Sequence, residues 1–248
     1  MKDFDFKNKN IVSPKRQKKD PCFSGSCLLI PSPFEFDLAV NRLGLKQSKE
    51  SRVDFFFHYL LSHNQKEISL VGPAIGAPAA VMLLEKLAVY GIKNLFVLGC
   101  CGSLQDNIKT GDLIIPIEAI REEGTSFHYA DSDFTPRASS KITELVSEVC
   151  SDKEAPFHKG KTWTTDAPYR ETGERVTEYK NSNVLGVEME LSALFTVAAL
   201  KRIELGGLLV VSDELSSLKW NKGFHTKAFK SSLDNGLRIA LKVLERLG

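Results

Sequence analysis

The sequence has no long hydrophobic run and almost no charge imbalance. No apolar stretch approaches the roughly 20 residues that a membrane-spanning helix needs, and the first twenty residues are polar and lysine-rich, unlike a secretory signal. The 33 lysines and arginines nearly balance the 31 acids and leave a formal charge of +2. We therefore expect a cytoplasmic protein, and the composition gives no case for a nucleic-acid or membrane partner.

Metal-binding patterns are also missing. The five cysteines form no CxxC pair, there is no HExxH motif, and the five histidines are scattered. We predict no metal site and no cofactor. The cysteines are expected to be reduced thiols, as in other cytoplasmic proteins. They are Cys22, Cys27, Cys100, Cys101 and Cys150.

The length and the hydrophobic patterns predict one α/β domain. A chain of 248 residues can bury one sizeable core and is short for two. Residues 1–20 are rich in lysine and poor in apolar side chains, which predicts a mobile tail ahead of a single domain at 21–248. The alternative for these lysines is a basic arm that binds nucleic acid. Apolar runs typical of buried strands alternate with helical patterns through the rest of the chain.

Three of the predicted buried strands end in polar or glycine-rich tips. One ends at Glu188 and Glu190, which bracket a methionine, and another ends at Asp213. The third enters the glycine-bracketed stretch GCCGS, which predicts a turn. Ligands of α/β proteins bind at the carboxyl edge of the sheet, so these tips predict one shared crevice. For the two glutamates the alternative is a solvated helix start, where acids suit the helix dipole. The strands are the runs 94–98, 184–187 and 206–212.

Five segments carry a resemblance to a known family. In chain order they read VGPAIGAP, GCCGS, TTDAPY, VEME and VVSDE. Together they resemble the nucleoside phosphorylase-I family, which includes purine nucleoside phosphorylases, uridine phosphorylases and adenosylhomocysteine-type nucleosidases. The resemblance runs from Leu28 to the C-terminus. It implies a three-layer α/β/α domain with a central mixed sheet, and an enzyme that cleaves the N-glycosidic bond of a nucleoside.

The resemblance also implies roles for the acids at the strand tips. Glu190 would accept hydrogen bonds from the ribose hydroxyls, and Met189 would pack under the sugar, with Glu188 beside them. Asp213 would be the general acid that protonates N7 of a purine and so improves the leaving group. Uridine phosphorylases generally lack this aspartate, so the VSD tip favours a purine.

The aromatic platform for the base differs from the family pattern. The segment TTDAPY resembles a TDxFY-like stretch whose aromatic side chain packs on the base, but Pro168 stands in place of the phenylalanine. Tyr169 is then the candidate platform, and Trp163 is the nearby alternative. Loss of such stacking, which is worth about 1–3 kcal/mol per base, would loosen base selection.

The nucleophile is where the chain departs most from the phosphorylases. Three positions that carry arginine in those enzymes read Glu35, Val97 and Ser216 here. The nucleosidases of the family carry a glutamate at the turn of Glu35, where it activates the attacking water. Glu35 is therefore a candidate catalytic group, although a surface acid at a helix start is an equal alternative. The acceptor stays open between water and a phosphate co-substrate held by other residues.

Three further residues are predicted to contribute to binding. In GCCGS, Cys100 replaces the family's serine or threonine, and the flanking glycines, including Gly102, let backbone N–H groups approach an anion or a ribose oxygen. Arg52 lies near a position where phosphorylases lend an arginine to the neighbouring subunit's phosphate. By resemblance we expect a homo-oligomer, a dimer or a hexamer of dimers. The rival to an enzyme is a nucleoside- or base-binding relative that has lost turnover.

Overall fold

A computed structural model of the protein describes residues 10–18, 20–47 and 51–247. Within these ranges the strands join one mixed sheet in the order β10-β9-β6-β7-β8-β5-β1-β4-β3-β2. The strands are β1 (Ser26–Leu29), β2 (Ser51–Val53), β3 (Phe56–His63), β4 (Lys66–Gly72), β5 (Asn94–Ser103), β6 (Leu113–Glu122), β7 (Phe157–Thr165), β8 (Val184–Glu188), β9 (Glu204–Glu214) and β10 (Asn221–Lys222).

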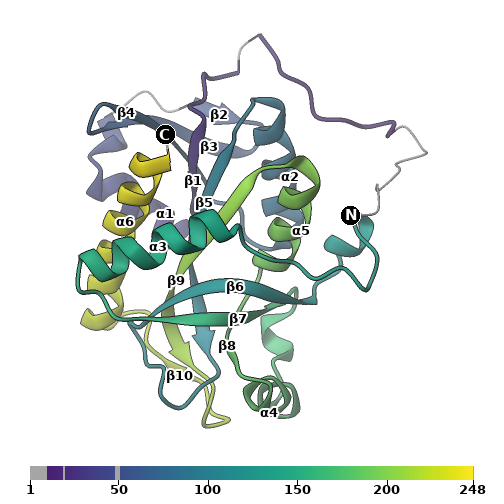
Figure 1. Ribbon diagram of the computed structural model, residues 1–248, viewed down its shortest axis with the longest axis vertical. Helices are drawn as coiled ribbons and strands as arrows, with labels where there is room; N and C mark the ends of the chain where they lie inside the picture. The colour runs from purple at the N-terminus through teal and green to yellow at the C-terminus, as the bar shows by residue number, and fades with distance from the viewer. Residues whose placement is uncertain (1–9, 19, 48–50, 248) are drawn as a thin grey trace.

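Helices cover both faces of this sheet, so the predicted α/β/α layering is confirmed. Figure 1 shows α1, α3 and α6 on one side and α2 and α5 on the other. The α-helices are α1 (Pro33–Arg42), α2 (Ala77–Val89), α3 (Ser140–Asp152), α4 (Gly173–Asn181), α5 (Leu191–Lys201) and α6 (Lys227–Leu247). Short 3-10 helices are η1 (Leu45–Gln47), η2 (Ser126–His128) and η3 (Pro168–Arg170).

The central strand β5 explains how the apolar runs fill two cores. Because side chains of a strand alternate between its faces, Phe96 and Leu98 pack into the cluster shared with α1, α3 and α6. Leu95 and Val97 pack into the cluster shared with α2 and α5. A strand buried on both faces has no polar face, which is why its sequence reads as continuous hydrophobic residues.

Five strands close into a ring, which the sequence does not predict. Besides its parallel pairing with β1, β5 pairs in parallel with β9 and antiparallel with β8. The ring continues from β9 to β6, from β6 to β7, and from β7 to β8. Closure brings the carboxyl ends of β5, β8 and β9 beside one another, although these strands are far apart in the sequence. The three tips therefore face one space.

The predicted turn at GCCGS is wrong. Strand β5 continues through it to Ser103, since Cys100 pairs with Val210 of β9 and Gly102 with Val187 of β8. The register shifts between Cys101 and Gly102, as at a β-bulge. Gly102 leaves room for the Leu215 side chain, since a Cβ on Gly102 would lie 2.5 Å from it.

The predicted mobile tail falls partly outside the described residues, which omit 1–9 and 19. Residues 10–18 form neither helix nor strand. The carbonyl of Lys15 accepts a hydrogen bond from Nζ of Lys86 on α2 at 3.3 Å. In the part of the chain that the structure describes, no helix is long and apolar enough to cross a membrane.

The pairing of β5 with β9 depends on a glycine, which generates a stability prediction. A Cβ on Gly207 would lie 2.6 Å from the Val97 carbonyl oxygen, so the two central strands cannot keep their spacing around a larger residue. We expect Gly207→Ala to lower the free energy of unfolding by about 1–3 kcal/mol in urea denaturation. The control is Gly25→Ala, because nothing lies within 4 Å of a Cβ there. Equal stability of the two variants would contradict this reading of the strand pairing.

Candidate functional site

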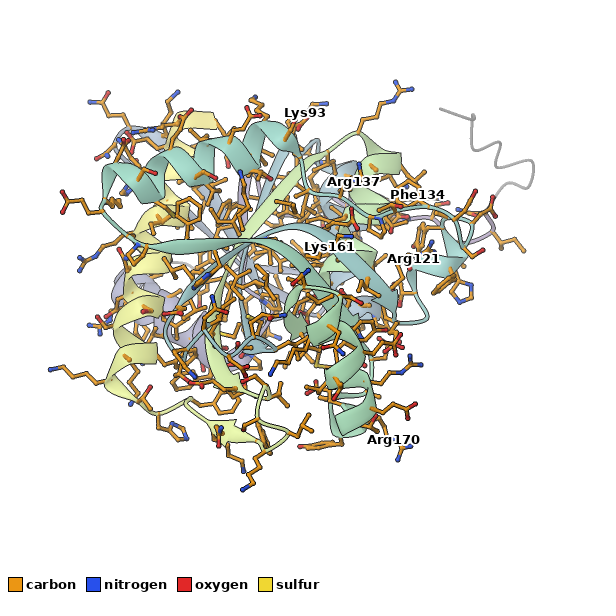
Figure 2. The ribbon with its side chains drawn as sticks, turned by 60° about the horizontal axis from the view of Figure 1, so that its bottom comes forward. Lys93, Arg121, Phe134, Arg137, Lys161 and Arg170 are labelled. Carbon is orange, nitrogen blue, oxygen red and sulfur yellow. The ribbon has the colours of Figure 1, made fainter. Side chains whose placement is uncertain are left out.

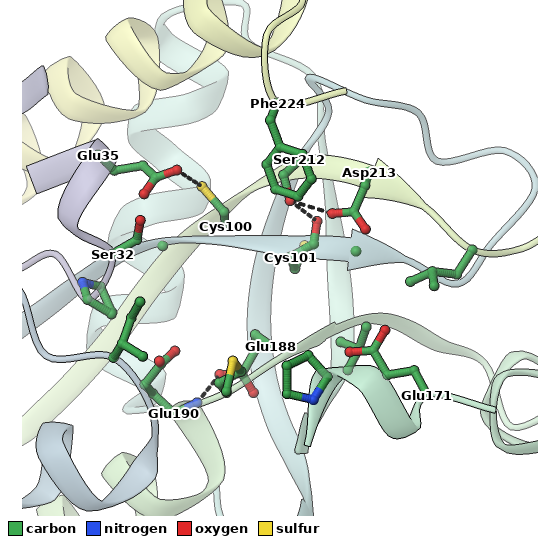
Figure 3. A pocket seen from close by; sticks show the side chains of 18 of the residues that line it. Ser32, Glu35, Cys100, Cys101, Glu171, Glu188, Glu190, Ser212, Asp213 and Phe224 are labelled. Carbon is green, nitrogen blue, oxygen red and sulfur yellow. Dashed lines mark hydrogen bonds between the residues drawn. The ribbon is translucent and has the colours of Figure 1, made fainter. Parts of the chain in front are cut away.

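A pocket of about 420 Å³ opens where β5, β8 and β9 end. Its volume falls within the range of small-molecule sites. The walls come from these strand tips, the start of α1, the η3 segment and the loop that follows β9. Figure 3 shows Glu35 and Glu190 at one end of this space and Asp213 and Glu171 at the other. The shared crevice predicted from the strand tips is therefore present.

Most of the predicted site residues line this pocket, and one does not. Those that do are Glu35, Cys100, Gly102, Tyr169, Glu188, Met189, Glu190 and Asp213. Arg52 lies outside the lining, on β2, where its guanidinium carbon is 4.3 Å from the centroid of the Phe57 ring. Its predicted role toward a neighbouring subunit is not tested by a single chain and stays a prediction.

The Glu188 side chain, at the end of β8, caps the start of helix α5. Its Oε2 accepts from the backbone N–H groups of Glu190 and Leu191, each at 2.7 Å, and Oε1 accepts from the Thr164 hydroxyl. Burial raises the pKa of Glu188 and these three donors oppose the rise. Glu188 thus lies at a helix start, as the alternative for the two glutamates states, but at 5% exposed it is not solvated, and it also borders the pocket.

Glu190 also lines the pocket, and its carboxyl group accepts fewer hydrogen bonds than that of Glu188. Its Oε1 accepts from the backbone N–H of Gly76 at 2.6 Å. Gly76 sits before α2 with a φ of 80°, a left-handed conformation that favours glycine, and the turn aims its N–H at the carboxyl group. Burial raises the pKa of Glu190, the nearby Glu188 raises it further, and the Gly76 hydrogen bond opposes both.

Glu35 enters the pocket from the first turn of α1 and is only 7% exposed. The Cys100 thiol donates to its Oε1 at 3.3 Å, whereas its buried Oε2 has no hydrogen-bond partner among the described residues. Burial raises the pKa of Glu35. Burial and the Glu35 carboxyl raise the pKa of Cys100, so Cys100 stays a thiol that can donate. The surface-acid alternative for Glu35 does not fit this burial.

Asp213 lies at the opposite end, near the tip of β9. Ser212 Oγ lies 2.6 Å from its Oδ1, and the indole N–H of Trp220 donates to its Oδ2 at 2.7 Å. Burial raises the pKa of Asp213, and the hydrogen bonds from Ser212 and Trp220 oppose the rise. The Asp213 carboxyl group therefore keeps its proton to a higher pH than a free aspartate does.

Glu171 and Trp220 also line the pocket, and the sequence did not single them out for the site. Glu171 belongs to the charged run 170–175, a pattern typical of a solvated face. Burial and the nearby Asp213 nevertheless raise the pKa of Glu171 to about 7. Trp220 lies in the loop after β9, and its contact with Asp213 depends on the path of that loop. The only sequence signal for Trp220 was an aromatic residue a short distance after Ser212 and Asp213.

The two aromatic candidates for the base platform differ in position. Tyr169 borders the pocket and is 92% exposed, so it is not a core residue. Trp163 is 1% exposed and packs against Tyr179 with ring centroids 4.7 Å apart. Trp163 is outside the pocket lining, and the alternative of Trp163 as the platform is wrong.

The charged side chains that line the pocket are all acidic. Five carboxyl groups line it, and none of its described lining residues is a lysine, arginine or histidine. Arg170 is exposed, and Figure 2 shows it at the outer surface beside α4. Arg137 and Lys161, also labelled there, pair with Glu118 at 3.3 and 3.1 Å.

Across residues 10–18, 20–47 and 51–247, no group of three or more histidine, cysteine or acidic side chains could hold a metal ion.

Comparison with known proteins gives a family, relatives and solved structures. The profile described as the Phosphorylase superfamily matches residues 27–247. A guanosine phosphorylase of Halorubrum lacusprofundi is 28% identical over 192 residues, which cover 75% of this chain and 79% of the relative.

Two solved structures share the fold. The purine nucleoside phosphorylase of Toxoplasma gondii in complex with immucillin-H has a TM-score of 0.83 at 18% identity, covering 97% of this chain and 98% of its own. The uridine phosphorylase of Vibrio fischeri ES114 has a TM-score of 0.81 at 21% identity, covering 96% of this chain and 100% of its own.

The buried acids generate a prediction about stability and pH. Since the pKa of Glu190 is raised above the usual 4.5, the folded protein holds a proton there that the unfolded chain releases. The free energy of unfolding should therefore fall as pH rises from 4.5 toward the raised pKa. Glu190→Gln removes this titration, and its amide oxygen can still accept from Gly76. Between about pH 5 and about pH 8 we expect the variant to lose less stability than the wild type, by on the order of 1 kcal/mol in urea denaturation.

The matched control is Glu144→Gln, which changes an exposed glutamate on α3. It should follow the wild-type pH dependence. If Glu190→Gln does so too, Glu190 is not held protonated by its surroundings.

Proposed function

The chain belongs to the phosphorylase superfamily, and we propose that it cleaves the N-glycosidic bond of a purine nucleoside. One observation carries the proposal: Glu190 and Asp213 line opposite ends of the same pocket. Cleavage of this bond builds positive charge on the sugar and negative charge on the leaving base. A pocket with a carboxyl group at each end can orient the pentose at one end and protonate the base at the other.

The sugar end fits Glu190 and Met189. In its carboxylate form Glu190 would accept hydrogen bonds from two hydroxyl groups at once, and its charge would favour a sugar that becomes cationic. Because those hydrogen bonds stabilise the charged form, we expect substrate binding to favour loss of the proton that Glu190 holds in the empty site. Gly76 fixes one oxygen of Glu190 at 2.6 Å, so the group is oriented before substrate binds. Met189 also lines the pocket, where its flexible thioether can pack under the ribose.

The base end fits Asp213 as general acid. Its raised pKa favours the protonated form, and protonation of N7 turns a purine into a better leaving group. Ser212 and Trp220 hold the carboxyl group from both sides, which fixes its orientation toward the pocket. The need for a proton at N7 supports a purine over a pyrimidine. Tyr169, at the mouth, can cover the base.

The acceptor is phosphate in the named relative, a guanosine phosphorylase, and the same reaction is the first candidate here. A phosphate dianion would need a cation from outside the described lining, such as an arginine of a neighbouring subunit. Water is the second candidate, and Glu35 is the observation that favours it. Its unpartnered Oε2 can take a proton from a water, while Cys100 holds the other oxygen at 3.3 Å.

We also propose a homo-oligomer, a dimer or a hexamer of dimers. Ile75, Met82 and Val89 recur every seven residues before and along α2 and are 53%, 43% and 39% exposed. An exposed apolar stripe of this kind is typical of a protein interface. Ile75 also borders the pocket, so an interface there would complete the site.

We propose a cytoplasmic location. The five cysteines are unpaired, as is usual in the reducing cytoplasm.

Replacement of the acid at the base end tests the proposal most simply. Asp213→Asn keeps the shape of the side chain and removes its proton. We expect release of base from adenosine, inosine or guanosine to slow by about 10²–10⁴-fold, the usual size of acid–base effects, as measured by chromatography of the free base. Asp106→Asn, which changes an exposed aspartate paired with Lys180, is the control and should keep full activity. Unchanged turnover in Asp213→Asn would remove Asp213 from the mechanism, and saturable binding with no release by the wild type would favour a binding protein.

The acceptor is decided by assays with and without inorganic phosphate. If water attacks with help from Glu35, base release needs no phosphate, and Glu35→Gln slows it by about 10²–10⁴-fold. Asp37→Asn, an exposed neighbour on α1, is the control and should leave the rate unchanged. Base release that depends on phosphate would instead identify phosphorolysis and overturn the water candidate.

A further inference from the structure

Oε2 of Glu35 is a buried carboxyl oxygen that has no hydrogen-bond partner among the described residues. The other oxygen accepts from the Cys100 thiol at 3.3 Å, and a thiol is a weak donor. The described residues that line the pocket include no lysine, arginine or histidine to neutralise the group. Burial raises the pKa of Glu35, as expected for a carboxylate that its surroundings stabilise poorly. Such a carboxylate loses an unfavourable charge when it forms a covalent bond.

Glu35 and Asp213 lie at opposite ends of the pocket, with Cys100 between them. Besides burial, the carboxyl groups of both Glu35 and Asp213 raise the pKa of the Cys100 thiol. Besides burial and Glu188, the Glu35 carboxyl group raises the pKa of Glu190, the residue assigned to the ribose. Figure 3 shows the same order along β5. A glycosidic bond that spans this strand has its anomeric carbon toward Glu35 and its departing nitrogen toward Asp213.

A carboxyl pair can cleave a glycosidic bond in two ways. The carboxylate opposite the leaving group either activates a water, or attacks the anomeric carbon itself and forms a glycosyl ester. An attacking water must be held by about two to four polar groups, and here it would have to reach an oxygen that is closed to solvent in the empty site. The binding energy of a whole nucleoside, held at Glu190 and Asp213, can instead bring the anomeric carbon into contact with Glu35. The burial of Oε2 therefore favours direct attack.

Resting on the proposed function, we propose that Glu35 is the nucleophile and holds the pentose as a ribosyl ester, so that the protein also exchanges one purine base for another. In the first step Oε2 forms a bond to C1′ and the C1′–N9 bond breaks. Asp213 gives its proton to N7 of the departing base.

The second step releases the pentose. A water, or N9 of a second purine base, attacks C1′, the ester bond from C1′ to Oε2 breaks, and the Glu35 carboxylate is restored. The proton lost by the water, or by N7 of the incoming base, returns to Asp213. Two successive displacements at C1′ retain the β configuration, whereas a single attack by water or phosphate inverts it.

Base exchange in buffer without phosphate tests the second activity. The protein is incubated with inosine and radiolabelled hypoxanthine, and label in inosine is measured by chromatography. We expect incorporation in the wild type, because the ester keeps the ribosyl group after the first base has left. Glu35→Gln should lose exchange by more than about 10³-fold, as expected for removal of a nucleophile. Asp37→Asn, the exposed neighbour on α1, is the matched control and should exchange at the wild-type rate.

The configuration of the product separates the nucleophile from a base that activates water. In dilute methanol the ribosyl ester should give methyl β-riboside, identified by proton NMR. Azide added to Glu35→Ala fills the space of the lost carboxyl group and should give α-ribosyl azide. Methyl α-riboside from the wild type, base release without label exchange, or base release that requires phosphate would each overturn the inference and leave nucleoside cleavage intact.

A reagent that needs no general acid covers the remaining outcome. A 2-fluoro-β-riboside with a dinitrophenolate leaving group should form the ester and hydrolyse it slowly, because fluorine disfavours the cationic transition state. We expect mass spectrometry to find one fluororibosyl group on Glu35 of the wild type and none on Glu35→Gln. Absence of cleavage of every natural nucleoside overturns the proposed function, and this reagent then decides the role of Glu35 alone. An unmodified wild-type protein would overturn that role.

Discussion

Burial of several carboxyl groups in one hollow is the constraint on which the rest of the site depends. Like charges repel strongly out of water, so such groups must be separated, hydrogen-bonded or protonated. The protein does all three. Glu35 and Glu190 lie apart from Asp213 and Glu171, Gly76 and Trp220 donate to carboxyl oxygens, and burial raises the pKa values.

Closure of the strand ring makes this arrangement possible. The pairings of β5 with both β8 and β9 bring tips from distant parts of the sequence to one opening. Gly207 allows the backbones of β5 and β9 to approach, since a Cβ there would lie 2.6 Å from the Val97 carbonyl oxygen, and Gly102 leaves room for the Leu215 side chain. Strand pairing thus brings residues of three strands together. The fold supplies the geometry, and the side chains at the tips supply the chemistry.

The sequence predicts the residues at strand ends better than those on loops. Glu35, Glu190 and Asp213 follow or adjoin apolar runs whose direction and edge can be inferred, and all three line the pocket. The ring closure and the path of β5 through GCCGS depend on pairing between distant segments, which local patterns do not carry. Glu171 and Trp220 lie on irregular segments, and nothing in a charged run or an isolated tryptophan shows that the chain folds back over the strand tips.

The central claim is that a nucleoside lies across this pocket with its sugar at Glu190 and its base at Asp213. A crystal structure with a bound purine nucleoside analogue tests it most directly. The account predicts ribose hydroxyls within about 2.5–3.0 Å of the Glu190 carboxyl oxygens and N7 at hydrogen-bond distance from Asp213. A nucleoside bound in the reverse orientation, or outside the space between these two side chains, would contradict it.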